Sequence, residues 1–413
     1  MGFVYLIKKM TEIFFEKLLN FGSDWRVERI EFNENNEVDI YLKWDLKSHK
    51  ESNKNTYELV HDYRDYRRWR HLDIMQFKTF INAKIPRIKH KDGNINSVEI
   101  PWASEANRHS FLFEILVIDW LLASKNQTQT AKMLRCGFNL VNRIMHNACQ
   151  RGLDSRSENI IYKQVSIDEK SFQSGHNYVT VLSSPDSGTV IDVFKNRTKE
   201  ATKNLLNNSL TDVQKSKIET VSLGMWKAYN TAVEEILPKA KKVHDRFHLI
   251  KYLNEAVDNV RKLEFKNNEV LRNSRYSFLK NTFNLTVKQY AKFEDVLRAN
   301  TKVGYVWGLK ESFKSLFGCN DYQEAFKKFS EWNDFVIWEA IPELSKVATM
   351  FCNHIKGVCN ALIEKTSNAM AERLNGKIQM IKTIGRGYRK FENFRSAILF
   401  FNGGLNLYPL KSW

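Results

Sequence analysis

Val165-Ser166-Ile167-Asp168-Glu169-Lys170 is the stretch of sequence that decides the fold. The pattern predicts a short apolar strand in which Val165 and Ile167 point to one side, and Ser166 and Asp168 to the other. Asp168 therefore places a carboxylate at the end of a strand. Taken alone, such a residue is most often part of a turn, so its meaning depends on the chain around it.

Residues 161–250 alternate between strands and helices around this stretch. Strands over 177–183 and 189–194, separated by the turn 184–188, indicate an antiparallel meander. The elements predicted next are a helix over 198–207, a strand over 218–223, a helix over 225–236 and a strand over 240–244. The order βββαβαβα is that of the ribonuclease-H-like fold, in which catalytic acids lie at the ends of neighbouring strands.

Glu372 is the second acidic candidate. A helix capped by Thr366 or Ser367 is predicted there. Its apolar stripe is Ala371, Leu374, Ile378 and Ile381, and the neighbouring polar stripe is Asn368, Glu372, Asn375 and Gln379. Glu372 is therefore expected at the edge of a site. A glutamate on a helix is usually only solvated, and it is the combination with Asp168 that favours a catalytic role.

The whole chain is predicted to be an α+β multidomain protein, with a ribonuclease-H-like α/β core interrupted by an all-helical insertion. The predicted segments are a small β-type module over 1–110, a helix-turn-helix over 111–155, the first part of the core over 156–250, the insertion over 251–360, and the last part of the core with a basic tail over 361–413.

Apolar residues at helical spacing define the insertion, and alternating residues define the first module. The helices predicted in the insertion cover 255–264, 287–299, 306–317, 322–332 and 343–354. The first module is expected to contain a strand over 76–87, a turn over 91–94 and a closing strand over 98–101.

Three helices over 111–124, 128–134 and 139–151 have the dimensions of a helix-turn-helix, with a tight turn at 135–138. The third helix is expected to present four polar side chains that could reach base edges in a major groove: Asn139, Asn142, Arg143 and His146. Three-helix units that bind no DNA are common, and the basic charge of the chain is what favours DNA binding here.

The formal net charge is +17, which favours a polyanionic partner such as nucleic acid. The segment 61–71 interleaves Arg64, Arg67, Arg68 and Arg70 with three aromatic residues, a composition suited to phosphate contacts and stacking. Aromatics in the core and arginines in solvent are an equally good interpretation. From residue 372 onward, eight Lys or Arg stand against two Glu, and Arg386, Arg389 and Lys390 belong to this segment.

The cysteines and the apolar runs predict a reduced, cytoplasmic protein. Five scattered cysteines form no C-x-x-C pair, and no apolar run approaches the length needed to cross a bilayer. The start of the chain continues into a charged amphipathic segment without a cleavage site. Neither export nor membrane association is expected.

Four stretches together resemble the DDE transposases of bacterial insertion sequences of the ISL3 type: 165–170, 243–248, 367–375 and 385–395. The likeness extends from about residue 55 onward. It implies cleavage of double-stranded DNA at terminal inverted repeats, strand transfer into target DNA, and action as a homodimer on DNA in the bacterial nucleoid. It also implies that Asp168 and Glu372 are metal ligands in a two-metal site for Mg²⁺ or Mn²⁺.

The chain departs from this family in two places. The family's second aspartate closes the fourth strand, where this chain has Gly224, which has no ligand atom. Asp245 and His248 resemble the C/D-x-x-H signature that follows that aspartate, and direct replacement of the missing ligand by Asp245 is the less favoured interpretation. The family's N-terminal zinc module often uses Cys and His, whereas residues 1–110 have no Cys, although His61, His71 and His90 remain.

Loss of one carboxylate makes the site less negative and weakens metal binding. We therefore expect a transposase fold whose chemistry is impaired in this copy. The alternative is a non-catalytic, transposase-derived DNA-binding protein or repressor. A general nuclease of the same fold is disfavoured, because the N-terminal modules and the insertion would have no obvious use.

Overall fold

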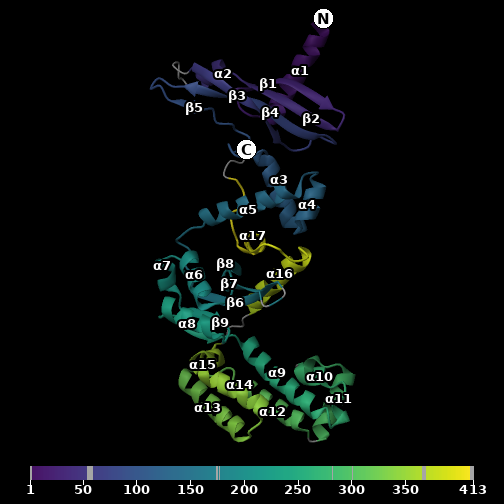
Figure 1. The fold of residues 1–413 in the computed structure, drawn as a ribbon, viewed down its shortest axis with the longest axis vertical. Coiled ribbons are helices and arrows are strands. Elements are labelled where there is room, and N and C mark those ends of the chain that lie inside the picture. Colours follow the sequence, from purple (N-terminus) through teal and green to yellow (C-terminus); the bar gives the residue numbers. More distant parts are fainter. Residues whose placement is uncertain are drawn as a thin grey trace. The chain divides into compact units, whose positions relative to one another are not determined.

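The computed structural model describes residues 2–53, 59–173, 175, 177–280, 282–299, 301–364 and 369–409. The side chains of residues 2–8, 51–53, 369, 371 and 372 are outside the described part. The chain divides into two units, a first unit of Met1–Arg156 with Leu405–Trp413 and a second unit of Ser157–Gly404. Figure 1 shows the elements of both units, and each unit is treated separately below.

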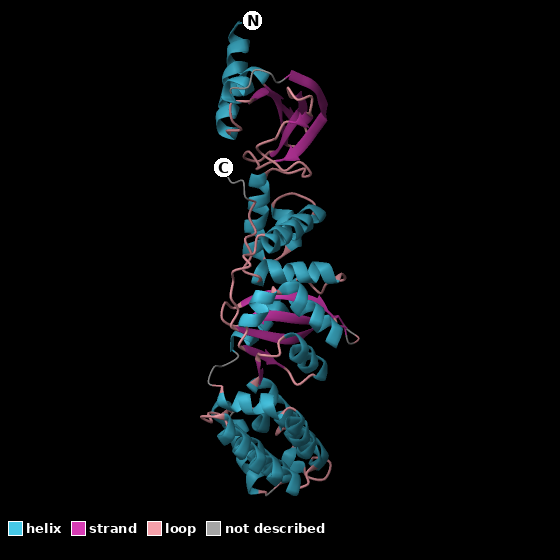
Figure 2. Cartoon of the chain, turned by 90° about the vertical axis from the view of Figure 1, so that its left-hand side faces the viewer, coloured by secondary structure: helices cyan, strands magenta, loops and turns pink. Residues whose placement is uncertain are grey.

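The first unit is built on a five-stranded sheet with strand order β1-β2-β4-β3, and a short fifth strand pairs with β4. Figure 2 shows these strands in magenta. All neighbours are antiparallel except β2 and β4, which are parallel. The strands are β1 (Trp25–Asn33), β2 (Glu37–Trp44), β3 (Leu59–Arg70), β4 (Lys78–Lys89) and β5 (Ile95–Ser97).

The predicted strand over 76–87 corresponds to β4, but the closing strand lies at Ile95–Ser97 rather than at 98–101. Two helices that were not predicted in this region accompany the sheet, α1 (Gly2–Leu19) and α2 (Leu46–Asn53). The core contains Trp102, which is fully buried and whose ring lies 4.8 Å from that of Trp25 and 5.6 Å from that of Trp69. Large aromatic side chains thus pack together at the centre of the core of this small sheet.

Three helices follow the sheet, as predicted: α3 (Phe111–Ser124), α4 (Gln127–Met133) and α5 (Phe138–Asp154). The Ser110 hydroxyl accepts a hydrogen bond from the backbone N–H of Phe113, and the Asn126 side chain accepts one from Gln129, so α3 and α4 both have N-terminal caps. The buried face of α5 repeats at helical spacing and comprises Val141, Ile144, Met145, Ala148 and Cys149.

Residues 405–409 pack within the first unit, although the sequence prediction placed them in the core. The Arg151 guanidinium donates to the carbonyl of Leu407 at 2.6 Å, and the Tyr408 hydroxyl donates to Asp119 at 2.7 Å. A Cβ atom at Gly152 would lie 2.6 Å from the Cβ of Leu405, so only glycine lets the returning chain approach α5 this closely.

A buried ionic network supports this contact. The Glu114 side chain is 2% exposed and accepts a hydrogen bond from Arg151 at 2.7 Å, while His109 lies 3.3 Å from its other oxygen. Burial by itself raises the pKa of the Glu114 carboxyl, but the hydrogen bonds from His109 and Arg151 outweigh it, and the net pKa is lowered.

This lowered pKa predicts acid sensitivity of the first unit. A carboxyl whose pKa is lower in the folded state stabilises the fold above its unfolded value of 4.5, and that stability is lost as the pH falls below this value. We expect the urea midpoint, followed by circular dichroism, to fall between pH 6 and pH 3. A Glu114→Gln variant should show a shallower fall, and equal slopes in the two proteins would contradict the assignment.

The second unit contains a sheet with strand order β10-β9-β6-β7-β8. Strands β6, β7 and β8 form the predicted antiparallel meander, and β9 and β10 run parallel to β6. Figure 1 shows α6 and α8 beside these strands. The bounds are β6 (Gln164–Gln173), β7 (Asn177–Ser184), β8 (Thr189–Lys195), α6 (Lys199–Ser209), α7 (Asp212–Lys217), β9 (Thr220–Leu223), α8 (Lys227–Ile236) and β10 (Lys241–His244).

Each face of this sheet is covered by different helices. Val165, Ile167, Val221 and Leu223 lie in one apolar cluster with Leu205 of α6 and Val233 of α8. On the opposite face, the ring of Phe172 stacks on that of Phe394 at 5.5 Å, and Arg395 donates to Asp192 at 2.8 Å. Phe394 and Arg395 belong to α17 (Phe391–Asn402), and α16 (Ala369–Ile384) reaches Asp168 through Asn375, so these two helices cover the face on which Asp168 lies.

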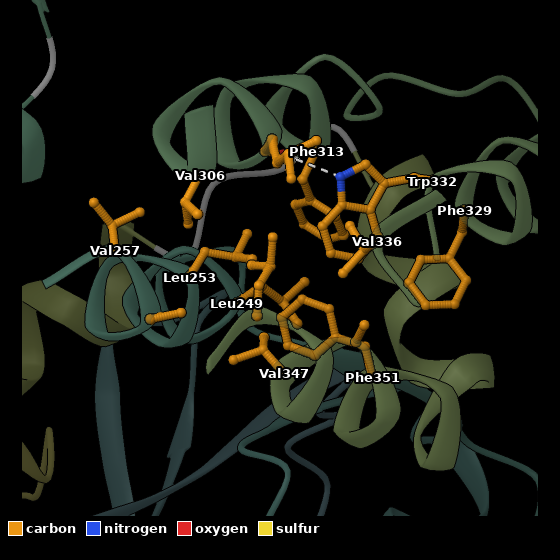
Figure 3. Close-up of a cluster of buried hydrophobic side chains, with 14 of the residues drawn as sticks. Leu249, Leu253, Val257, Val306, Phe313, Phe329, Trp332, Val336, Val347 and Phe351 are labelled. Atoms are coloured by element: carbon orange, nitrogen blue, oxygen red, sulfur yellow. Dashed lines mark hydrogen bonds between the residues drawn. The ribbon is translucent and has the colours of Figure 1, made fainter. Parts of the chain in front are cut away.

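Residues 246–363 form the helical part of the second unit. Figure 3 shows its core, in which side chains of α9, α12, α13 and α14 converge and the Trp332 indole donates to the carbonyl of Leu309 at 3.0 Å. The helix predicted over 255–264 is the second half of α9. The elements are α9 (Arg246–Glu264), η1 (Glu269–Leu271), α10 (Arg275–Leu279), η2 (Thr282–Asn284), α11 (Val287–Arg298), α12 (Lys302–Lys314), α13 (Tyr322–Trp338), α14 (Pro342–Asn353) and α15 (Ile355–Ile363).

Within the described ranges, no helix combines the length and the apolar character that crossing a membrane requires.

Candidate functional site

Asp168 lies on the middle strand of the second sheet, on the face covered by α16. It was predicted to end its strand, but β6 continues to Gln173 because β7 pairs with it along that extension. Its carboxylate Oδ1 accepts a hydrogen bond from the backbone N–H of Glu169 at 2.8 Å. The Asp168 side chain is 19% exposed, so the carboxylate is partly accessible to solvent and ligands.

Two further groups approach the other oxygen of Asp168. The Asn375 side-chain amide donates to Oδ2 at 2.5 Å, and the Lys170 ammonium lies 3.2 Å from the same atom. Neither residue was predicted from the sequence to have a role at this site. Strand alternation could have identified Lys170, because residues two apart share a face of a strand. Helical spacing places Asn375 one turn after Glu372, but its contact with β6 is a tertiary feature.

Gly224 directly follows β9, whose last pair with β6 is Leu223 opposite Ile167. Continuing this register by one residue sets Gly224 beside Asp168. An added Cβ at Gly224 meets no atom within 4 Å, and its φ lies outside the left-handed region that favours glycine. Neither the backbone nor the packing requires glycine here, so the position is open to a larger side chain.

Glu372 lies in α16, and its side chain is outside the described part, as are Thr366, Ser367 and Asn368. In the part of α16 that follows Glu372, the residues of the predicted apolar stripe are buried: Leu374, Ile378 and Ile381. Asn375 reaches Asp168 from the same helix. The role of Glu372 as a metal ligand stays a prediction.

Asp245 follows β10 and caps α9, because its Oδ1 accepts a hydrogen bond from the backbone N–H of Phe247 at 2.8 Å. Its other oxygen lies 3.5 Å from Nδ1 of His248. Asp245 therefore serves as the N-terminal cap of α9. The neighbouring His244 is buried, and burial lowers its pKa to about 4, so its imidazole is neutral at pH 7.

The donor groups described at Asp168, which leave out the Glu372 side chain, do not by themselves complete a two-metal centre. Two ions that bridge the attacking and leaving oxygens need several carboxylates around them. Gly224 supplies no donor, and Asp168 already holds an ammonium and an amide on one oxygen. Among the described side chains, no group of three or more His, Cys, Asp or Glu residues is arranged to hold a metal ion. The possible zinc ligand His71 is instead buried, with Nδ1 2.8 Å from the Ser110 hydroxyl.

The four arginines of 61–71 lie on β3, and their charges are largely engaged within the first unit. Arg70 is 6% exposed and donates to the carbonyl of His71 at 2.6 Å. Arg68 donates to Asp39 at 2.7 Å, and Arg67 bonds backbone carbonyls of the 105–107 loop. Arg64, with a side chain 48% exposed, is the one of the four with the most accessible guanidinium. Contact of this set with DNA stays a prediction.

Of the four side chains predicted to face outward on the third helix, Asn139 and Arg143 are exposed on α5, whereas Asn142 and His146 are half-buried. Contact of these side chains with DNA stays a prediction. The turn before α5 is fixed by Arg135, which has a positive φ of 49° and donates to the carbonyl of Gln76 at 2.6 Å.

A second basic surface lies at the turn between α16 and α17, where Arg386, Arg389 and Lys390 are exposed. The Gln173 amide donates to the carbonyls of Tyr388 and Arg389 at 3.0 and 3.1 Å. These bonds fix the turn to the end of the strand that carries Asp168. The three charges therefore lie on a well-anchored loop of the second unit.

Comparison with known proteins agrees with this geometry. A family model described as a transposase, of the DDE ISL3 group, matches residues 165–398. The chain is 24% identical over 354 residues to the transposase for insertion sequence element IS1557 of Mycobacterium tuberculosis, covering 78% of each chain. It is 25% identical over 282 residues to the transposase for IS1001 of Bordetella parapertussis, covering 66% of this chain and 69% of that one. The matched region starts at the strand that carries Asp168.

Proposed function

This chain belongs to the ISL3 family of DDE transposases, and we propose that it binds the terminal inverted repeats of an insertion sequence as a homodimer in the bacterial cytoplasm, with impaired cleavage and strand-transfer chemistry. The family's activity depends on divalent metal ions. The second unit is proposed to be the ribonuclease-H-like core, because its meander and its two parallel strands follow the order expected for that fold.

One observation carries the proposal of impaired chemistry. Gly224 directly follows Leu223, which pairs with Ile167 next to Asp168, and it is an open position where the resemblance to the family implies a carboxylate. A site of this kind acts through clustered charge and positioning, so removal of one of three carboxylates is a direct loss.

The same observation supports a second candidate, a non-catalytic DNA-binding protein that occupies the repeats or represses transposition. DNA binding requires exposed polar and basic groups, and it does not require the carboxylate cluster. The exposed side chains of α5 and the anchored basic turn at 386–390 are described above and remain available to such a protein. Both candidate functions therefore require binding to the terminal repeats, and a direct binding experiment tests this requirement first.

The binding experiment is a footprint on DNA that carries the element's ends, performed at several salt concentrations. We expect protection of the terminal repeats, with an affinity that falls steeply as salt rises, because phosphate contacts release counterions. Equal protection of unrelated DNA would contradict specific recognition of the ends.

The proposed helix-turn-helix makes a sharper prediction at Arg143. We expect Arg143→Ala to weaken binding to the terminal repeats about tenfold, since a good side-chain contact with a base is worth about 1–3 kcal/mol. The matched control is Arg298→Ala, which removes a side chain that is 77% exposed at the end of α11 in the helical part. Equal loss of affinity in the two variants would show that only overall charge matters.

A further inference from the structure

An ammonium and a side-chain amide meet at Oδ2 of Asp168. Lys170 shares a face of β6 with Asp168, and Asn375 reaches the same oxygen from α16. The Lys170 and Asp168 side chains are 24% and 19% exposed, so the pair is partly withdrawn from water. An ammonium and an amide therefore occupy one oxygen of the carboxylate expected to bind metal.

We propose that Lys170 and Asn375 take the place of a divalent ion at Asp168 in this chain, so that the chain engages DNA without bound metal. The inference rests on the proposed DNA-binding function. It follows from the ammonium and the amide that meet at Oδ2 of Asp168 and from the lack of a ligand atom at Gly224.

The charge at the site explains why DNA can approach without metal. Adjacent carboxylates repel one another and also repel phosphate, and cations are needed to offset this repulsion. Gly224 removes one carboxylate, and the Lys170 ammonium balances the charge of Asp168. An incoming phosphate thus meets a nearly neutral pair at this position. A divalent ion at Oδ2 would have to displace an ammonium that is already there.

The first test measures affinity for terminal-repeat DNA in Mg²⁺ and in EDTA. The unaltered chain should bind within about twofold in the two buffers, because the Lys170 ammonium already balances the charge of Asp168. Gly224→Asp adds the second carboxylate in open space, and it should bind about tenfold more weakly in EDTA and recover in Mg²⁺.

The matched control for the added charge is Gly308→Asp. Gly308 is exposed on α12, and a Cβ there also meets no atom within 4 Å. This variant should show no dependence on Mg²⁺. Loss of DNA binding by the unaltered chain on transfer to EDTA would overturn the inference, as would a Gly224→Asp variant that is insensitive to EDTA.

The second test uses Mn²⁺ and the protein alone, followed by the electron paramagnetic resonance signal of free Mn²⁺. Lys170→Met should raise the affinity for Mn²⁺ about tenfold, because it removes the competing cation. Lys170→Arg should keep the weak binding of the unaltered chain. Lys195→Met on β8 is the control for loss of an exposed lysine and should change nothing.

The two tests separate the inference from the function on which it rests. If the chain binds terminal-repeat DNA in neither buffer, the proposed function fails, and the Mn²⁺ measurement still decides the role of Lys170. If Lys170→Met and the unaltered chain bind Mn²⁺ equally, the inference fails whatever the DNA result. Unchanged thermal unfolding of each variant confirms that the fold is intact.

Discussion

Gly224→Asp is expected to raise Mg²⁺- or Mn²⁺-dependent cleavage at the terminal repeats by at least about 100-fold, the scale on which one preorganised group acts in an active site. The new carboxylate would enter open space beside Asp168, on the strand next to it. It would supply the carboxylate that the resemblance to the family implies at this place. No rearrangement of the backbone is required, since φ at Gly224 is one that aspartate adopts readily.

The measurement is cleavage of a labelled DNA end by the unaltered chain, by Gly224→Asp and by Gly308→Asp. The last of these adds the same charge to an open helical position away from Asp168. Robust and equal cleavage by the first two proteins would show that Gly224 does not limit the chemistry. Cleavage by none of them would show that the defect lies elsewhere as well.

Glu114→Ala is expected to destabilise the first unit by about 3 kcal/mol, because removal of one partner from a buried ion pair leaves the other without its counter-charge. Glu114 is 2% exposed and contacts both His109 and Arg151. The loss would loosen α5 and the returning segment 405–409 together, because Arg151 also holds the carbonyl of Leu407.

Hydrogen exchange of peptides from α3 and α5 measures this effect locally. The control is Glu105→Ala, whose side chain is 75% exposed and pairs with Arg64 at 3.5 Å. An exposed pair of this kind contributes little, so its loss should leave the exchange rates nearly unchanged. Similar exchange in the two variants would mean that the Glu114 network does not hold the unit together.

Local sequence patterns predicted most of the elements but not their long-range contacts. The strands of the meander, the three helices over 111–154 and most helices of 246–363 follow from periodicity, because period and burial are linked within each element. Helices α1 and α2 were not predicted: both lie in a region otherwise rich in strand signals, and α2 has almost no apolar residues to give a helical period. The return of 405–409 to α5 depends on a single glycine, Gly152, which local periodicity does not reveal.

The same holds for the candidate site, where local patterns predicted some residues but not their long-range contacts. Asp168 could be identified from strand alternation, and Gly224 became meaningful once the strand order was known. Arg70 shows where composition misleads, because an arginine in a basic run is expected on the surface and is instead buried among backbone carbonyls. Asn375 needed the packing of α16 on β6, which links positions far apart in the chain.

The return of residues 405–409 to the first unit also sets an order of events during synthesis. The ribosome releases α5 early, but its partner Leu407 emerges only after the whole second unit has been made. The contacts of the first unit can therefore be completed only at the end of translation. A premature stop codon anywhere in the second unit would remove part of the first as well.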